Sequence, residues 1–284
     1  MIGLYHTIMG LPRSGKTTFL AALWHILDAG ETDTRLVLDK LVGDHTHLNS
    51  IVAAWRRCEP MPRTSIAAET VVTIHMHEPA SDQRVILSFP DLSGESMERQ
   101  FAERTGARDF VAGTARAGGI MLFINADRGH DGITILDVAE FGGDALAGEI
   151  PSPQVATPWS PSVVPEQAQL VDLLQHMMRP PFERRVRRLA IIISAWDVVG
   201  DITLTPEAWL GREMPLLDQF LKTNAAVFET ASYGVSAQGG RLDADDREPL
   251  ARQVPSLRIR CVGLGVAPHD ITAPISWLNA GSDR

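Results

Sequence analysis

The chain has 284 residues, of which 44% are hydrophobic and 21% charged, and its formal net charge is −9. This composition indicates a globular protein with a sizeable core, and the negative charge argues against a broad surface for nucleic acids. No apolar run reaches the roughly 18 residues of a membrane span, and the first residues lack signal-peptide features, so a cytoplasmic location is expected. Cys58 and Cys261 lie far apart, so neither a disulfide framework nor a zinc site is predicted.

Short apolar runs alternate with amphipathic stretches, which is typical of a mainly parallel sheet with helices on both faces. Strands are predicted, in chain order, at residues 2–9, 66–77, 84–89, 119–125, 189–194 and 232–236, with a seventh at one edge, 257–263. Helices are predicted at residues 16–29, 46–57, 97–115, 165–178 and 206–222. We therefore expect one α/β domain over residues 1–284, with a helical insertion at about 35–62 and a Gly/Pro-rich insertion at about 128–165.

The segment GLPRSGKT, residues 10–17, follows the first predicted strand and opens the first predicted helix. It fits the pattern G-x-x-x-x-G-K-[ST], in which backbone N–H groups and the positive end of a helix hold phosphate oxygens. Lys16 is expected to reach the β and γ phosphates, and the hydroxyl of Thr17 to bind Mg²⁺. The sequence thus predicts a phosphate-binding loop for a nucleoside triphosphate.

The strand predicted at 84–89 leads into the segment PDLSGE, residues 90–95. Asp91 stands where a carboxylate holds the magnesium shell; the alternative is an aspartate that only caps the following helix. Gly94 has no Cβ to obstruct the turn, so its amide is able to approach a γ phosphate. The pattern D-x-x-G directly after a strand is typical of a nucleotide-dependent switch.

Two later strand ends carry SAWD, residues 194–197, and SAQ, residues 236–238. With the two earlier segments, and in this order, they resemble the motifs of the Ras-like GTPases of the TRAFAC class over about residues 2–238. The loop GLPRSGKTTFLAALW, the turn PDLSGE, SAWD and the later DITAPISWL are similar to the bacterial double-GTPase group, which gene neighbourhoods associate with conflict and defence systems. The resemblance implies a three-layer P-loop NTPase fold of about six strands, GTP or GDP as ligand, and Mg²⁺ as cofactor.

The resemblance also assigns the recognition of the base. It makes Asp197 the carboxylate that accepts two guanine N–H groups, and the backbone N–H of Ala237, next to Ser236, the donor to guanine O6. Trp196 either covers the base or simply packs in the core. Guanine selection is therefore expected to depend on the ends of two late strands.

SAWD departs from the family pattern N-K-x-D at its first two positions. Ser194 and Ala195 stand where the family has Asn and Lys. The change is expected to remove a side-chain tether and a lysine stem that packs over the base. The guanine assignment therefore rests on Asp197 and Ala237.

Three residues are expected to act near the γ phosphate. Thr64, just before the second predicted strand, takes the place of the switch I threonine that approaches Mg²⁺ and the γ phosphate. Glu95 stands where many Ras-like enzymes have a water-orienting glutamine, and a carboxylate there repels the phosphate, so slow hydrolysis is expected; alternatively, Glu95 only favours the N-terminus of the next helix. Arg13 either supplies the charge of an arginine finger or points to solvent or a partner.

The predicted site has three overlapping sets of residues. The nucleotide contacts are Gly10, Arg13, Ser14, Gly15, Lys16, Thr17, Thr18, Asp197, Ser236 and Ala237. The catalytic residues are Lys16, Thr64, Gly94, Glu95 and Arg13, and the Mg²⁺ ligands are Thr17, Thr64 and Asp91.

Three functional hypotheses follow from these residues. The favoured one is a GTP-binding, slowly hydrolysing molecular switch that acts on a protein partner, a second GTPase or an effector, in a bacterial defence system. The second is an ATP-using P-loop enzyme such as a small-molecule kinase, although no arginine-rich lid segment is evident. The third is a scaffold that needs nucleotide only to fold, which Glu95 and SAWD favour.

Overall fold

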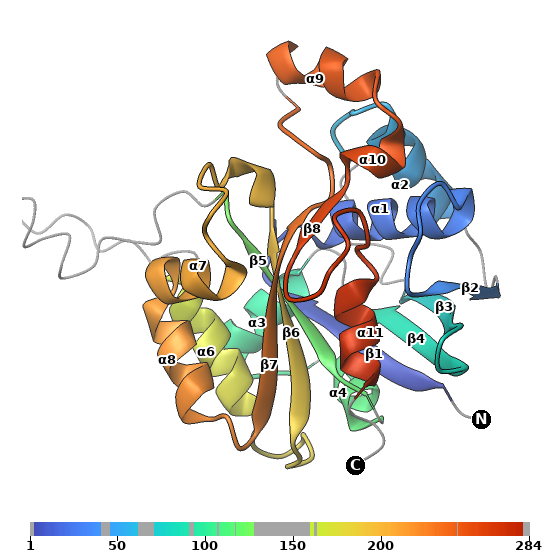
Figure 1. Cartoon of the computed structure of the whole chain (residues 1–284). Helices are drawn as coiled ribbons and strands as arrows, with labels where there is room; N and C mark the ends of the chain where they lie inside the picture. Colours follow the sequence, from blue (N-terminus) through green and yellow to red (C-terminus); the bar gives the residue numbers. More distant parts are fainter. Residues whose placement is uncertain are drawn as a thin grey trace, which may run out of the picture.

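The computed structural model describes residues 3–40, 46–61, 71–90, 94–106, 108–116, 118–127, 160–161, 164–242 and 244–280. Its strands are β1 (Leu4–Gly10), β2 (Val37–Lys40), β3 (Val72–Glu78), β4 (Gln83–Phe89), β5 (Ile120–Asn125), β6 (Arg187–Ser194), β7 (Phe228–Ser236) and β8 (Arg260–Val262). They form one eight-stranded sheet in the order β2-β3-β4-β1-β5-β6-β7-β8 (Figure 1).

The centre of the sheet is parallel and its edges are antiparallel. Strands β4, β1, β5, β6 and β7 pair in parallel in that order, whereas β2 and β3 at one edge and β8 at the other pair antiparallel. The apolar sequence of β5, IMLFIN, suits a strand covered on both faces. The predicted α/β fold with a mainly parallel sheet is confirmed.

The strand predictions need two corrections, and a third strand is covered only in part. The sheet has eight strands instead of about six, because the short edge strand β2, VLDK, is too polar to show a strand pattern in the sequence. Only the end of the predicted strand 257–263 pairs, since Pro255 begins a helix in front of β8. The strand predicted at 66–77 is seen from Val72, and its first residues lie outside the described part of the chain.

The helices of the described residues cover both faces of the sheet. They are α1 (Lys16–Ala29), α2 (Thr46–Arg56), α3 (Glu95–Glu103), α4 (Arg108–Ala115), α6 (Glu166–His176), α7 (Pro206–Glu213), α8 (Pro215–Thr223), α9 (Ala244–Ala251), α10 (Pro255–Arg258) and α11 (Ala273–Asn279), together with the 3-10 helix η3 (Trp196–Val198). Figure 1 shows α6, α7 and α8 on one side of the sheet and α1, α2 and α11 on the other.

Alternating side chains of the central strands divide the core into two layers, because successive strand residues point to opposite faces. Phe123 and Ile192 belong to the apolar cluster under α1, α2 and α11. Leu122 and Ile191 belong to the cluster under α3, α4, α6, α7 and α8. The sheet is therefore buried on both faces, and its strand ends are left to form a site.

Two predicted helices are each divided in two. The helix predicted at 97–115 is α3 followed by α4, because Arg104 ends α3 in the left-handed conformation with φ 61°. The helix predicted at 206–222 is α7 followed by α8: Met214 leaves helical geometry at φ −133°, and Pro215 begins the next helix without an N–H to donate.

The two predicted insertions are covered to different extents. Helix α2 confirms the helix predicted at 46–57 and lies in the insertion predicted at about 35–62. Most of the insertion predicted at about 128–165 lies outside the described residues. The single-domain organisation of residues 1–284 stays a prediction.

Within the described ranges, no helix is long and apolar enough to cross a membrane. The cytoplasmic location stays a prediction. Cys58 and Cys261 are free and buried, in agreement with the expectation of no disulfide.

Candidate functional site

The loop between β1 and α1 is curled so tightly that glycine is required at both of its pattern positions. Gly15 precedes α1 in the left-handed conformation with φ 89°, and a Cβ there would lie 2.6 Å from the side chain of Ser194 at the end of β6. A Cβ at Gly10 would lie 2.6 Å from the Oγ atom of Ser14. The G-x-x-x-x-G spacing therefore has the close backbone approach that a phosphate-binding loop needs.

Lys16 is held inside this loop. Its side chain is buried, and Nζ donates hydrogen bonds to the carbonyl oxygens of Gly10 and Leu11 at 2.9 Å each and to Ser14 Oγ at 3.2 Å. A lysine ammonium is a compact point charge, so these acceptors fix a positive charge at the loop. This is the arrangement expected of a lysine that binds β and γ phosphates.

Side chains from two neighbouring strands hold the loop by its carbonyl groups. Ser194 Oγ, at the end of β6, donates to the carbonyl oxygen of Ser14 at 2.9 Å. Asn125 Nδ2, at the end of β5, donates to the carbonyl oxygen of Arg13 at 3.0 Å. Because a trans peptide places its C=O and N–H in opposite directions, the Ser14 carbonyl held by β6 turns the Gly15 N–H the other way.

These contacts correct the expectation that Ser194 removes a tether. The serine hydroxyl makes a tether of its own, and Asn125 adds a second one that the sequence reading missed. The signal was present in the sequence, since Asn125 is the polar residue that ends the apolar strand IMLFIN. Polar residues at the carboxyl ends of parallel strands commonly contribute to a ligand site.

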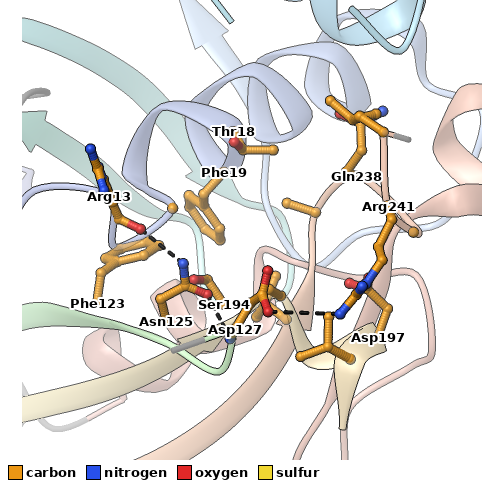
Figure 2. A pocket seen from close by; sticks show the side chains of 17 residues that line it. Arg13, Thr18, Phe19, Phe123, Asn125, Asp127, Ser194, Asp197, Gln238 and Arg241 are labelled. Atoms are coloured by element: carbon orange, nitrogen blue, oxygen red, sulfur yellow. Dashed lines mark hydrogen bonds and ion pairs between the residues drawn. The ribbon is translucent and has the colours of Figure 1, made fainter. Parts of the chain in front are cut away.

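A cavity of about 330 Å³ opens between this loop and the ends of β5, β6 and β7 (Figure 2). It brings together predicted site residues from three segments, namely Arg13, Gly15, Thr18, Asp197 and Ala237. One end of the cavity is therefore the phosphate loop, and the other end is the pair of late strand ends to which base recognition was assigned.

At the base end of the cavity, formed by the late strand ends to which base recognition was assigned, Ser236 holds two groups in place. Asp197 lies exposed on η3, and the buried hydroxyl of Ser236 donates a hydrogen bond to its Oδ1 atom. The backbone N–H of Gly239 donates to the same hydroxyl oxygen at 3.2 Å. Ser236 thus fixes both the carboxylate and the loop that follows β7.

Trp196 packs away from the cavity. A Cβ at Gly234 would lie 2.3 Å from the indole ring of Trp196, and the rings of Trp196 and Trp209 are 6.4 Å apart in an edge-on arrangement. Of the two alternatives for this tryptophan, the structure has the packing role. The absence of a Cβ at Gly234 is what lets the ring lie on β7.

A charged pair lies at the wall of the cavity. Arg241 Nη2 lies 3.8 Å from Asp127 Oδ1, and both side chains line the cavity (Figure 2). Both are well exposed, so the pair itself contributes little to stability. The sequence reading missed both residues, because nothing in their local pattern marks them and only the fold brings them together.

The turn before α3 packs directly on the phosphate loop. Gly94 is buried with φ 82°, and a Cβ there would lie 2.6 Å from Leu11 C and from Pro12 N. Only glycine fits this contact. Glu95 is exposed and begins α3, with Glu98 also in the first turn, where negative charge favours a helix N-terminus.

Of the remaining predicted site residues, the structure describes some and not others. Thr17 lies half-buried in the first turn of α1, and Arg13 is exposed with φ 63°. Thr64 and Asp91 lie outside the described residues, so their predicted roles, and the Mg²⁺ site they share with Thr17, stay predictions. Among the residues that the structure describes, no cluster of three or more His, Cys, Asp or Glu side chains is suited to hold a metal ion.

Comparison with known families gives a match over most of the chain. The sequence model of the family Double-GTPase 1 matches residues 7–278. No curated protein matches the chain.

Three solved structures are among those that match the chain. The bacterial selenocysteine-specific elongation factor EF-Sec is 14% identical, with a TM-score of 0.37 over 90% of this chain and 30% of its own. The GTP-bound Ski7 GTPase-like domain of S. cerevisiae is 12% identical, with a TM-score of 0.44 over 100% of this chain and 50% of its own. A chain of the SRb-GTP/SRX complex from Chaetomium thermophilum is 11% identical, with a TM-score of 0.39 over 89% of this chain and 100% of its own. The chain thus spans half or less of the first two structures.

We expect Lys16→Ala to lower GTP affinity by about a hundredfold or more, because the β and γ phosphates lose their charge-assisted hydrogen bonds. Isothermal titration calorimetry measures this loss. Lys222→Ala is the matched control, since this exposed lysine pairs only locally with Asp218 on α8, and it should leave affinity unchanged. Equal GTP affinity of the parent and Lys16→Ala would contradict the phosphate-loop assignment.

We expect Asn125→Leu to weaken GDP and ADP binding alike by about fivefold, because one hydrogen bond that holds the phosphate loop is lost. Fluorescence titration with both nucleotides measures the two affinities. An effect confined to GDP would show that Asn125 acts on the base and not on the loop.

Proposed function

Because the chain belongs to the Double-GTPase 1 family, we propose that it is a molecular switch that binds GTP and hydrolyses it to GDP and phosphate. Membership of a GTPase family supports the binding of GTP. The observation that carries the proposal is the cavity lined at one end by Arg13 and Gly15, of the loop that holds Lys16, and at the other by Asp197 and Ala237. A nucleotide placed along it has its phosphates at the positive charge and its base at the carboxylate.

The base end suits guanine and not adenine. Guanine presents two N–H donors, at N1 and at the 2-amino group, to the carboxylate of Asp197, and its O6 accepts from the backbone N–H of Ala237. Adenine presents an acceptor at N1 and a donor at its 6-amino group, so both contacts become unfavourable. The hydroxyl of Ser236 supports this selection, since it orients the carboxylate.

The phosphate end suits attack of water on the γ phosphorus. The bond from the γ phosphorus to the bridging oxygen breaks, GDP leaves, and the proton of the water passes to phosphate. Lys16 would stabilise the negative charge that develops on the transferred group, and Gly94, which lies against the loop, would direct its N–H at that group. The negative side chain of Glu95, exposed at the start of α3, repels the γ phosphate, so hydrolysis without a partner is slow.

The oxygen donors predicted from the sequence suit Mg²⁺. The hydroxyl of Thr17 follows Lys16 directly, and with Asp91 and Thr64 it would supply the hard oxygen ligands that this cation prefers. When bound, Mg²⁺ neutralises charge on the β and γ phosphates. These three residues are the ligands we propose.

The switch would act through the turn at Gly94. This turn packs on the backbone of the phosphate loop. Binding or loss of the γ phosphate would therefore shift the turn together with α3, the helix that follows it. We assign the output to a protein partner, a second GTPase or an effector, and the biological setting to a bacterial defence system. A nucleotide-bound scaffold with little hydrolysis is the second candidate, favoured by the position of Glu95 at a helix N-terminus.

Binding of fluorescent GTP, GDP and ATP to the purified protein, followed by measurement of phosphate release, tests these candidates. Preference for GTP with slow release supports the switch. Preference for GTP with no release, even over many hours, supports the scaffold. Tight binding of ATP with turnover would point to an ATP-using enzyme.

We expect Asp197→Asn to lower GTP affinity and raise affinity for xanthosine triphosphate, each by about tenfold or more. The amide donates to the 2-oxo group of xanthine, whereas the carboxylate repels that oxygen. Competition against a fluorescent nucleotide measures both changes, with Asp201→Asn, outside the cavity, as the control. If ATP competes as well as GTP in the parent protein, the guanine assignment is wrong.

We expect single-turnover GTP hydrolysis by the parent protein at about 10⁻⁴ to 10⁻² per second, and Glu95→Gln to be about tenfold faster, because a neutral amide orients water without repelling phosphate. Rapid-quench measurement of released phosphate gives the rates. Glu98→Gln removes a charge from the same helical turn and should leave the rate unchanged. If both variants hydrolyse GTP at the rate of the parent protein, Glu95 does not act on hydrolysis and only stabilises the N-terminus of α3.

A further inference from the structure

The loop that follows β7 is bound to α2, a helix far away in the sequence. The indole Nε1 of Trp55 donates to the carbonyl oxygen of Ala237 at 3.0 Å. In return, the side-chain Nε2 of Gln238 donates to the carbonyl oxygen of Trp55 at 3.3 Å and contacts Cys58 Sγ at 3.4 Å. These contacts join two segments about 180 residues apart in the chain, so the loop is positioned from outside its own strand.

The Trp55 contact determines which way the peptide between Ala237 and Gln238 faces. Ala237 and Gln238 line the cavity, and Trp55 does not. The carbonyl of Ala237 points at the indole, and the N–H of the same planar trans peptide, which belongs to Gln238, points in the opposite direction. The indole therefore turns the N–H of Gln238, a residue that lines the cavity, away from α2.

Trp55 is itself fixed from both sides. Its side chain is fully buried, with the guanidinium of Arg258 4.7 Å from the centre of the indole and the ring of His25 5.1 Å away. Buried Arg258 also donates to the carbonyl oxygen of Trp55 at 3.3 Å, and Arg56 Nε donates to His25 Nδ1 at 3.0 Å. Burial, together with the neighbouring Arg56 cation, lowers the pKa of His25, so its ring is neutral at pH 7 and free to accept this bond.

We infer that Trp55 is a positioning residue for recognition of the 6-oxo group of guanine: it orients the peptide between Ala237 and Gln238, so that the N–H of Gln238 is a second donor beside the Ala237 N–H already assigned to O6. The inference rests on the proposed function, since it presumes that a guanine base occupies this end of the cavity. Trp55 touches no nucleotide. It makes α2, the helix of the predicted switch I insertion, part of the apparatus that distinguishes bases.

The variant Trp55→Phe tests this inference, because it keeps an aromatic ring between Arg258 and His25 and removes only the indole donor. Affinities for GDP, ADP and 6-thioguanosine diphosphate are measured by calorimetry; the thio analogue keeps both N–H groups of guanine and replaces the 6-oxo group by a weak acceptor. Trp277→Phe, on α11 with Arg188 over its ring, is the matched control and should leave all affinities unchanged.

Trp55→Phe should weaken GDP binding about five- to tenfold and change binding of the thio analogue by less than about twofold. Equal weakening of both ligands shows a merely structural role and overturns the inference, as does an unchanged GDP affinity. If the parent protein binds ADP as tightly as GDP, the proposed function itself fails, and this result comes from the parent alone.

A second variant decides the case if circular dichroism shows that Trp55→Phe is unfolded. Gln238→Met removes the other hydrogen bonds between this loop and α2 while keeping the length of the side chain. Like Trp55→Phe, Gln238→Met should lower the ratio of GDP affinity to affinity for the thio analogue. An unchanged preference in Gln238→Met would then overturn the inference.

Discussion

Three backbone segments meet around Lys16 at distances that leave no room for a side chain. A Cβ at Gly10 would lie 2.6 Å from Ser14 Oγ in the same loop, and a Cβ at Gly15 would lie 2.6 Å from the side chain of Ser194 on β6. A Cβ at Gly94 would lie 2.6 Å from the backbone of the loop. This constraint brings the turn before α3 against the backbone of the loop that holds the buried ammonium. The proposed coupling between the γ phosphate and α3 depends on the same contact, because a turn held farther from the loop would not respond to a phosphate bound there.

The parallel sheet makes this meeting possible. Strands β1, β5 and β6 lie side by side, so their carboxyl ends lie at one edge of the sheet. The loop leaves β1, and Asn125 and Ser194 reach its carbonyl groups from the two neighbouring strand ends. Since the strands are buried on both faces by alternating side chains, these polar ends are the part of each strand left to bind a ligand.

The two ends of the cavity are stabilised in different ways. The phosphate end is built mostly from one short segment and the strand ends beside it. The base end instead depends on contacts between distant segments: Ser236 holds Asp197, and Trp55 holds the peptide after Ala237. The inferred base recognition therefore depends on the position of α2 in addition to the strand ends that hold the phosphate loop.

The sequence alone determined the features that local chemistry controls. Residues 10–17 define a phosphate loop because the glycines, the lysine and the following helix act within a few residues of one another, and buried parallel strands such as β5 are continuous apolar runs. Tertiary structure decided what depends on distant partners. The edge strand β2 gains its hydrogen bonds from β3, Ser194 makes a tether because Ser14 lies beside it, and Asn125, Arg241 and Trp55 join the site only through the fold. Periodicity and spacing report which face a residue occupies, but they do not report which distant backbone group its side chain will meet.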